Sequence, residues 1–222
     1  MRAALLPLLA LCCLAAPAAR GEVYDLLPLG GGWAQWEKAL GSKKLWSEPV
    51  EVNGVRGTLD VSLLELDFAE ALRVSRRELP GVPGAVNANS ALFELKEGKS
   101  LRRVYLVGFP GKARTMRFAM EIPYGASRGR LWPGQLPSLP GMEPKESLCL
   151  PGRQLCYGAC KVASSPAAAA AELERVLSAQ GWRRLEDGFL LSADAKQAFL
   201  FSAAADGKGS TTVSLVRKNL DK

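Results

Sequence analysis

Residues 49–64 of this 222-residue chain read PVEVNGVRGTLDVSLL and contain the clearest structural signal in the sequence. Both arms are rich in aliphatic and β-branched residues, and Asn53-Gly54 stands between them. An Asn-Gly pair between two such runs is typical of a tight hairpin turn, because both positions tolerate a positive φ. The stretch therefore predicts an antiparallel hairpin with strands over 49–52 and 55–64.

Two helices are expected beside this hairpin. Trp33, Trp36 and Leu40 recur at i, i+3 and i+7, which predicts a short helix before it. Asp67 and Glu70 resemble a capping box, which predicts that a second helix begins there and continues to about residue 78, before Pro80-Gly81. Three strands should follow, over 91–95, 103–109 and 114–122. Apolar and other residues alternate along the last of them, which predicts one buried face.

The second half repeats this order of elements. A strand is expected over 157–162, and Ser165-Pro166 is typical of a helix start. That helix should end at Gly181. Short strands are then expected over 182–186, 189–192, 198–204 and 211–217, with glycine-containing turns between them.

These patterns predict an α+β fold with two similar small domains, each an antiparallel sheet with one helix packed on one face. We expect a signal peptide over 1–18, a first domain over 22–122, a Pro/Gly-rich linker over 123–147 and a second domain over 148–222. The linker should lie along a domain surface through its large apolar residues. A single larger sheet shared by both halves is the alternative architecture.

The N-terminus has the pattern of an export signal. Arg2 precedes an apolar run, and Ala16-Pro17-Ala18 places small residues at positions −3 and −1 of a cleavage site. An uncleaved anchor, or a lipoprotein modified at Cys12 or Cys13, is the alternative. The sequence thus predicts a periplasmic or secreted protein that does not span the membrane after cleavage.

Export favours a disulfide among the three later cysteines. Cys149 and Cys156 flank Pro151-Gly152, which predicts a small hairpin closed by a Cys149–Cys156 bond. Cys160 would then be a small apolar residue of the next strand. A Cys156–Cys160 bond, or a bond from the odd thiol to a second chain, is left open.

The second half also resembles a known type of module. Its lead Leu139-Pro140-Gly141, its helix closing on Gly181-Trp182 and its last strand, which begins at Gly209-Ser-Thr, carry the resemblance. It resembles small C-terminal modules of uncharacterised exported bacterial proteins, over about 80 residues, although the aromatic pair usual in their helix is absent here. The resemblance implies an α+β fold and a periplasmic or secreted location, and it supplies no functional residues.

Two groups of side chains are candidates for binding. Trp33, Trp36 and Trp46 could line a ligand groove, although tryptophans more often pack in a core. The chain carries a net charge of +7. Its paired basic residues could attract an anionic surface or an envelope protein; they are Arg76, Arg77, Arg102, Arg103, Arg183 and Arg184. No basic-aromatic motif for nucleic acid is present in the sequence, and export makes such a partner unexpected.

Catalytic signals are few. The sequence has no histidine, which excludes Ser-His and Cys-His nucleophiles and histidine-based zinc sites. We therefore expect no catalytic residues, no metal and no cofactor, and we interpret the protein as an exported non-enzymatic binding protein. A hydrolase acting on envelope lipid or polysaccharide through carboxylates alone is the alternative, with Glu65, Asp67 and Glu70 as the nearest cluster. The sequence does not indicate an oligomeric state.

Overall fold

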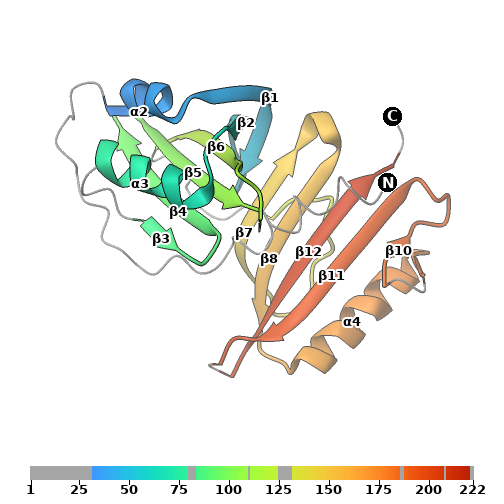
Figure 1. The fold of residues 1–222 in the computed structure, drawn as a ribbon. Helices are drawn as coiled ribbons and strands as arrows, with labels where there is room; N and C mark the ends of the chain where they lie inside the picture. The colour runs from blue at the N-terminus through green and yellow to red at the C-terminus, as the bar shows by residue number, and fades with distance from the viewer. Residues whose placement is uncertain are drawn as a thin grey trace. The chain divides into compact units, whose positions relative to one another are not determined.

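The computed structural model describes residues 32–79, 84–109, 111–124, 132–185, 188–207 and 209–220. The expected signal peptide lies outside these residues. The chain divides into two compact units. The N-terminal unit comprises Ala18–Val50 and Val55–Ala126, and the C-terminal unit combines Ser127–Lys222 with Glu51–Gly54. Antiparallel sheet dominates both, with few helices (Figure 1).

The N-terminal unit contains two helices and six strands within the described residues. In chain order they are α2 (Gly32–Leu40), β1 (Ser42–Val52, whose last two residues belong to the C-terminal unit), β2 (Val55–Leu64), α3 (Phe68–Glu78), β3 (Gly84–Val86), β4 (Ser90–Glu97), β5 (Ser100–Gly108) and β6 (Thr115–Pro123). The strand order in the sheet is β3-β4-β5-β6-β2-β1. Since both α2 and α3 occur here, the expectation of one helix per sheet is wrong for this unit.

Local sequence explains the expected hairpin and the second helix. Asn53 and Gly54 have φ values of 51° and 80°, so the turn uses the positive φ that the Asn-Gly pair predicts. Asp67 caps α3, because its carboxylate accepts a hydrogen bond from the backbone N–H of Glu70 at 2.8 Å. Both predictions are confirmed.

The core of the N-terminal unit lies between its helices and one face of the sheet. It contains Trp36, Leu40, Leu64, Ala71, Val74, Leu79, Ala91, Phe93, Val104, Leu106 and Ala119. The prediction that β6 buries one face only is wrong, because Arg117 and Ala119 are buried as well as Phe118 and Met120. The helices cover the face that carries Arg117 and Ala119, so the arginine is enclosed there.

The C-terminal unit contains one α-helix, a short 3-10 turn and six strands within the described residues. They are β7 (Glu143–Leu150), η1 (Pro151–Arg153), β8 (Leu155–Val162), α4 (Pro166–Ala179), β9 (Arg183–Arg184), β10 (Leu190–Leu191), β11 (Gln197–Ala205) and β12 (Thr211–Asn219). The strand order is β7-β8-β12-β11-β10-β9, and each of these pairs is antiparallel. As predicted, Ser165 caps α4 and Gly181, with φ 85°, follows its end.

The range 123–147, expected to be a linker, contains the start of a strand. β7 begins at Glu143, and its pairing with β8 shifts register between Pro144 and Glu146. Such an irregularity accommodates a proline that cannot donate to the ladder. Upstream, Leu136 and Leu139 are buried in the core of the C-terminal unit. That core also contains Leu173 and Leu177 of α4, Trp182 and Phe199.

The two units share their order of strands. In each, a hairpin is followed by a helix, and the last strand of the unit pairs with the second strand of the hairpin. Thr115 and Thr211 begin these last strands, and both are buried. Each donates a hydrogen bond from Oγ1 to the backbone oxygen of the residue before the helix cap, Leu66 at 3.0 Å and Ser164 at 2.5 Å. Within the described residues, no helix is both long and apolar enough to cross a membrane.

Candidate functional site

The candidate site is a cavity of about 280 Å³ in the C-terminal unit. Its lining combines two charged residues, three carboxamides, a disulfide and a few apolar side chains. The lining residues are Glu51, Gln135, Cys149, Leu150, Pro151, Gln154, Leu155, Cys156, Arg217 and Asn219. Pro151 and Gln154, in the turn between β7 and β8, form part of the lining.

Strand register places four of these residues in one lateral row. Glu51 is opposite Cys149, Cys149 is opposite Cys156, and Cys156 is opposite Arg217. Directly opposed residues of neighbouring antiparallel strands point to the same face of a sheet. The floor of the cavity is therefore a row with a carboxylate at one end, a guanidinium at the other and a disulfide between them.

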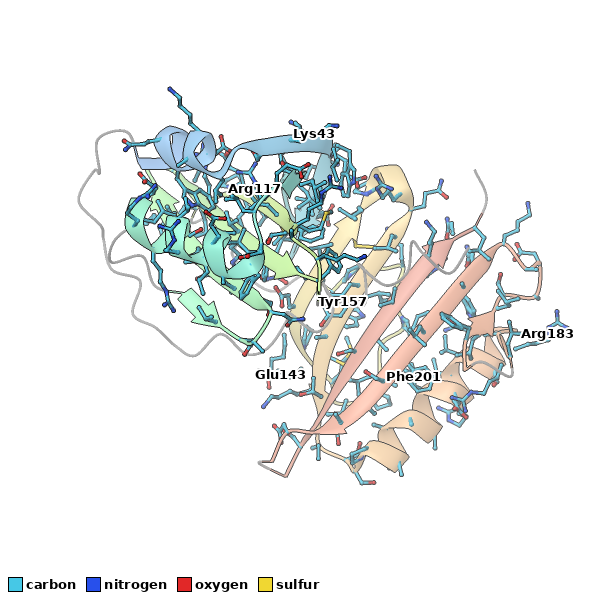
Figure 2. The ribbon with its side chains drawn as sticks, viewed as in Figure 1. Lys43, Arg117, Glu143, Tyr157, Arg183 and Phe201 are labelled. Atoms are coloured by element: carbon cyan, nitrogen blue, oxygen red, sulfur yellow. A yellow bond between two sulfur atoms is a disulfide. The ribbon has the colours of Figure 1, made fainter. Side chains whose placement is uncertain are left out.

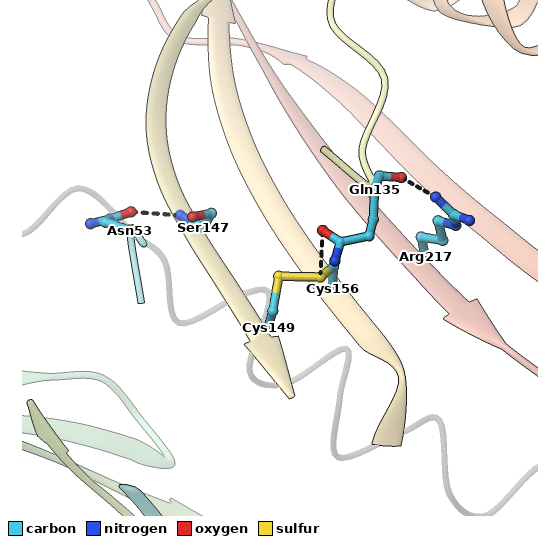
Figure 3. The surroundings of a disulfide bond; sticks show 6 residues. All are labelled: Asn53, Gln135, Ser147, Cys149, Cys156 and Arg217. Carbon is cyan, nitrogen blue, oxygen red and sulfur yellow. Dashed lines mark hydrogen bonds between the residues drawn. A yellow bond between two sulfur atoms is a disulfide. The ribbon is translucent and has the colours of Figure 1, made fainter. Parts of the chain in front are cut away.

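The disulfide joins Cys149 and Cys156, as the spacing of the cysteines predicts. Their Cα atoms are 4.1 Å apart across the β7–β8 pair. Closing so short a loop stabilises the folded chain by about 2.5 kcal/mol on the chain-entropy estimate. Figure 3 shows the bond beside Gln135. Ser147, which lies on β7 with Cys149, donates its backbone N–H to Asn53 Oδ1 at 2.7 Å.

Arg217 connects the floor to the segment above it (Figure 3). Its Nη1 donates to the backbone oxygen of Gln135 at 2.5 Å, and its Nη2 donates to Gln197 Oε1 at 2.9 Å. Both acceptors are uncharged. Nε of Arg217 is buried and has no hydrogen-bond partner within the described part of the chain. The guanidinium is thus fixed in position without being neutralised by a carboxylate there.

Residues 132–142 cover the sheet beside the cavity. A Cβ atom on Gly158 of β8 would lie 2.5 Å from Leu136 Cδ1 and 2.7 Å from the Trp132 ring, so only glycine allows this approach. Trp132 Nε1 also donates to the backbone oxygen of Pro137 at 3.2 Å. These contacts hold Gln135 over the disulfide, where its Oε1 is 3.7 Å from Cys156 Sγ.

The remaining thiol lies in the core. Cys160 is fully buried, and burial raises its pKa from 9.0 to about 11. The thiol is therefore protonated at neutral pH, and a protonated thiol is a poor nucleophile. Its place in the core agrees with the expectation of an apolar packing role.

The predicted tryptophan groove does not form around Trp36. This side chain is fully buried, donates from Nε1 to Ser75 Oγ at 3.1 Å and packs edge-to-face against Phe93. It is a core residue because α2 and α3 enclose it. Trp46 is half-buried on β1, and the side chain of Trp33 lies outside the described residues.

Most of the predicted basic pairs make ion pairs. The pairs are Arg77–Glu78 at 2.7 Å, Arg102–Glu121 at 3.1 Å, Arg103–Glu94 at 2.6 Å and Arg184–Glu174 at 2.6 Å. Arg76 and Arg183 are exposed, and Figure 2 shows Arg183 extending from the sheet into solvent. Consecutive strand residues such as Arg102 and Arg103 point to opposite faces. These residues therefore do not form one positive patch within the N-terminal unit.

Sequence reasoning missed a buried cluster around Arg117 (Figure 2). This side chain is only 4% exposed, and its guanidinium donates to Glu37 Oε1 at 2.7 Å and to Ser62 Oγ at 3.3 Å. Asp60 lies in the same region, 2.7 Å from Lys44 Nζ. Burial acts to raise the pKa of Asp60, but hydrogen bonds and positive charge, chiefly from Lys44, outweigh it and hold the pKa below its usual value.

The acidic residues considered for catalysis have structural roles. Glu65 pairs with Arg114 at 2.9 Å, Asp67 caps α3, and Glu70 lies 3.4 Å from Arg73. In the part of the chain that the structure describes, no group of three or more Cys, Asp or Glu side chains is placed to hold a metal ion.

Comparisons with protein-family models, with curated proteins and with solved structures find no match to this chain.

Proposed function

We propose that this protein is an exported, non-enzymatic binding protein with two related α+β domains, and that the cavity of the C-terminal unit holds a small polar ligand. The cavity carries the proposal. Its volume of about 280 Å³ lies just below the range of about 300–1,000 Å³ for pockets that bind drug-sized ligands, which suits a smaller ligand. Its charged ends and carboxamides converge on one space, as polar groups do in ligand sites.

The disulfide supports export, because such bonds persist in oxidising compartments such as the periplasm or the medium. The N-terminal pattern supports the same location, with cleavage after Ala18. Mass spectrometry of the protein recovered from an exporting cell would then give an N-terminus at Ala19. An intact Met1 on the recovered protein would contradict export by this signal.

The shared strand order supports two related domains. The pairs Leu64–Thr115 and Val162–Thr211 are opposed in equivalent places, and the threonine hydroxyl bonds before each helix are also equivalent. Such agreement in register goes beyond a common order of elements.

Binding is favoured over hydrolysis by the chemistry of the lining. Glycosidase-type hydrolysis by carboxylates requires two facing acids. Glu51 is the one carboxylate among the ten lining residues, and the guanidinium opposite it neither accepts a proton nor attacks a substrate. The ion pairs of four of the six candidate arginines likewise favour the cavity over an anionic surface as the binding site.

Thermal denaturation with a panel of small polar solutes tests this function. A ligand that binds only the folded protein raises its melting temperature, by about 2–4 °C for each 1 kcal/mol in a chain of this size. Asn219→Trp should fill the cavity and abolish the rise. Lys218→Trp, the neighbouring position on the other face of β12, should retain it. If no solute stabilises the wild type in a manner sensitive to Asn219→Trp, the proposed function is wrong.

A further inference from the structure

The cavity presents two opposite charges at its two ends. Neither Glu51 nor Arg217 forms an ion pair with any described residue, and both line the same space. They are separated by two intervening strands, so three strand spacings place their Cα atoms about 14 Å apart. The two side chains are therefore at a distance where they do not neutralise each other directly.

Arg217 retains donors for a ligand. Its bonds to Gln135 and Gln197 use one N–H on each terminal nitrogen, and each of these nitrogens carries a second N–H. A carboxylate is the ligand group that best matches such a fixed guanidinium. At the other end, Glu51 matches an ammonium group by charge.

The middle of the cavity matches an amide. Gln135, Gln154 and Asn219 each bring a carboxamide, which can both donate and accept hydrogen bonds. Leu150 and Leu155 also contribute to the lining. A ligand with an ammonium, a peptide group and a carboxylate in this order would use all of these groups at once.

We propose that the cavity binds a free dipeptide, with its ammonium at Glu51 and its carboxylate at Arg217. This inference rests on the proposed function and names the ligand class of the same site. An extended dipeptide is about 7 Å long, which is less than the distance of about 14 Å between the two Cα atoms, so it fits between the two charged groups. A ligand with one charge leaves the opposite charged group without a partner, so both charges should be required.

The test is titration calorimetry of the full exported chain with alanyl-alanine as the probe. Three blocked forms serve as controls: N-acetyl-alanyl-alanine, alanyl-alaninamide and the doubly blocked dipeptide. The free dipeptide should bind at least tenfold more tightly than each blocked form. Equal affinities for free and blocked forms would overturn the proposal.

Variants then assign each charge to its end of the cavity. Glu51→Gln should weaken binding of alanyl-alanine at least tenfold and leave the weak binding of the N-acetyl form unchanged, because that form has no ammonium. Arg217→Gln should weaken the free dipeptide similarly and leave alanyl-alaninamide unchanged. Lys218→Gln removes a neighbouring charge on the opposite face of β12 and should change neither affinity. Circular dichroism of each variant checks that it is folded.

The outcomes separate this inference from the function on which it rests. If a different solute stabilises the protein in a manner sensitive to Asn219→Trp, while alanyl-alanine does not bind, the ligand class is wrong and the cavity remains the binding site. If alanyl-alanine binds equally well to wild type, Glu51→Gln and Asn219→Trp, it binds elsewhere and the dipeptide inference is wrong. The proposed function is wrong as well only if no other solute stabilises the protein in a manner sensitive to Asn219→Trp.

Discussion

The two units have the same strand register, but they differ in the polarity of one buried pair of residues. Counting two residues from the buried threonine at the start of each last strand reaches Arg117 in the N-terminal unit and Val213 in the C-terminal unit. The opposed residues are Ser62 and Cys160. All four are nearly or fully buried. One unit therefore encloses a polar pair at the position where the other encloses an apolar pair.

The segment that precedes each hairpin explains the difference. In the N-terminal unit this segment is α2, whose Glu37 accepts a hydrogen bond from Arg117. In the C-terminal unit it is residues 132–142, which contain no charged side chain and pack Trp132 and Leu136 against β8. A buried charge is tolerated only when it is paired, so the covering segment determines which residue the strand can carry.

The largest expected effect comes from moving the arginine. Val213→Arg would bury a guanidinium where residues 132–142 offer no carboxylate, and should cost about 4 kcal/mol of the free energy of unfolding. Urea denaturation measures the loss, and hydrogen exchange should locate it in the C-terminal unit. Ser214→Arg, on the opposite face of the same strand, is the matched control and should cost at most about 1 kcal/mol. An unchanged denaturation midpoint for Val213→Arg would contradict the comparison.

Removing the carboxylate from the N-terminal unit should have a smaller effect. Glu37→Gln leaves Arg117 buried without its closest negative charge, and we expect a loss of about 2 kcal/mol, since Glu37 is partly exposed. Urea denaturation measures this loss as well. Adding Arg117→Met should restore most of the stability, because an apolar side chain of similar size then fills the site as Val213 does in the other unit. If the double variant is less stable than Glu37→Gln alone, an apolar side chain cannot replace the buried arginine in the N-terminal unit.

Stability at alkaline pH tests the apolar pair of the C-terminal unit, which contains Cys160. Since burial raises the pKa of Cys160 from 9.0 to about 11, the folded protein holds the thiol proton more tightly than the unfolded chain. The resulting stability is complete below pH 9 and is lost as the pH rises from 9 towards 11. At pH 10.5 the loss should be about 2 kcal/mol. In denaturant titrations, the free energy of unfolding should fall between pH 7 and pH 10.5 by about 2 kcal/mol more in the wild type than in Cys160→Ala. An equal fall in both proteins would contradict the assignment.

Local patterns predicted the elements whose signals are contiguous. The Asn53-Gly54 turn, the capped helix that ends before Gly181 and the Cys149–Cys156 bond all depend on residues close together in the chain. Strand β7 was harder to predict, because a proline such as Pro144 is typical of a linker. The register shift that accommodates it in the strand cannot be seen in the sequence.

Long-range partners were beyond the reach of the same reasoning. Arg117 reads as the exposed side of an alternating strand, and nothing near it in the sequence indicates that Glu37, 80 residues earlier, will neutralise it. Similarly, the cysteines identify one wall of the cavity, but the row from Glu51 to Arg217 exists only through the pairing of four strands.

The smallest expected effect tests the equivalence of the units directly. Thr115→Val and Thr211→Val keep the side-chain shape and leave the backbone oxygens of Leu66 and Ser164 without their hydroxyl donors. Each should lower the free energy of unfolding by about 1 kcal/mol, as for a buried neutral hydrogen bond. Thr212→Val, at a half-buried position beside Thr211, is the control and should change stability by less than about 0.5 kcal/mol. Hydrogen exchange should increase at the start of α3 in the first variant and of α4 in the second. A loss confined to one unit would mean that the threonine hydrogen bond does not stabilise both units in the same way, despite their shared register.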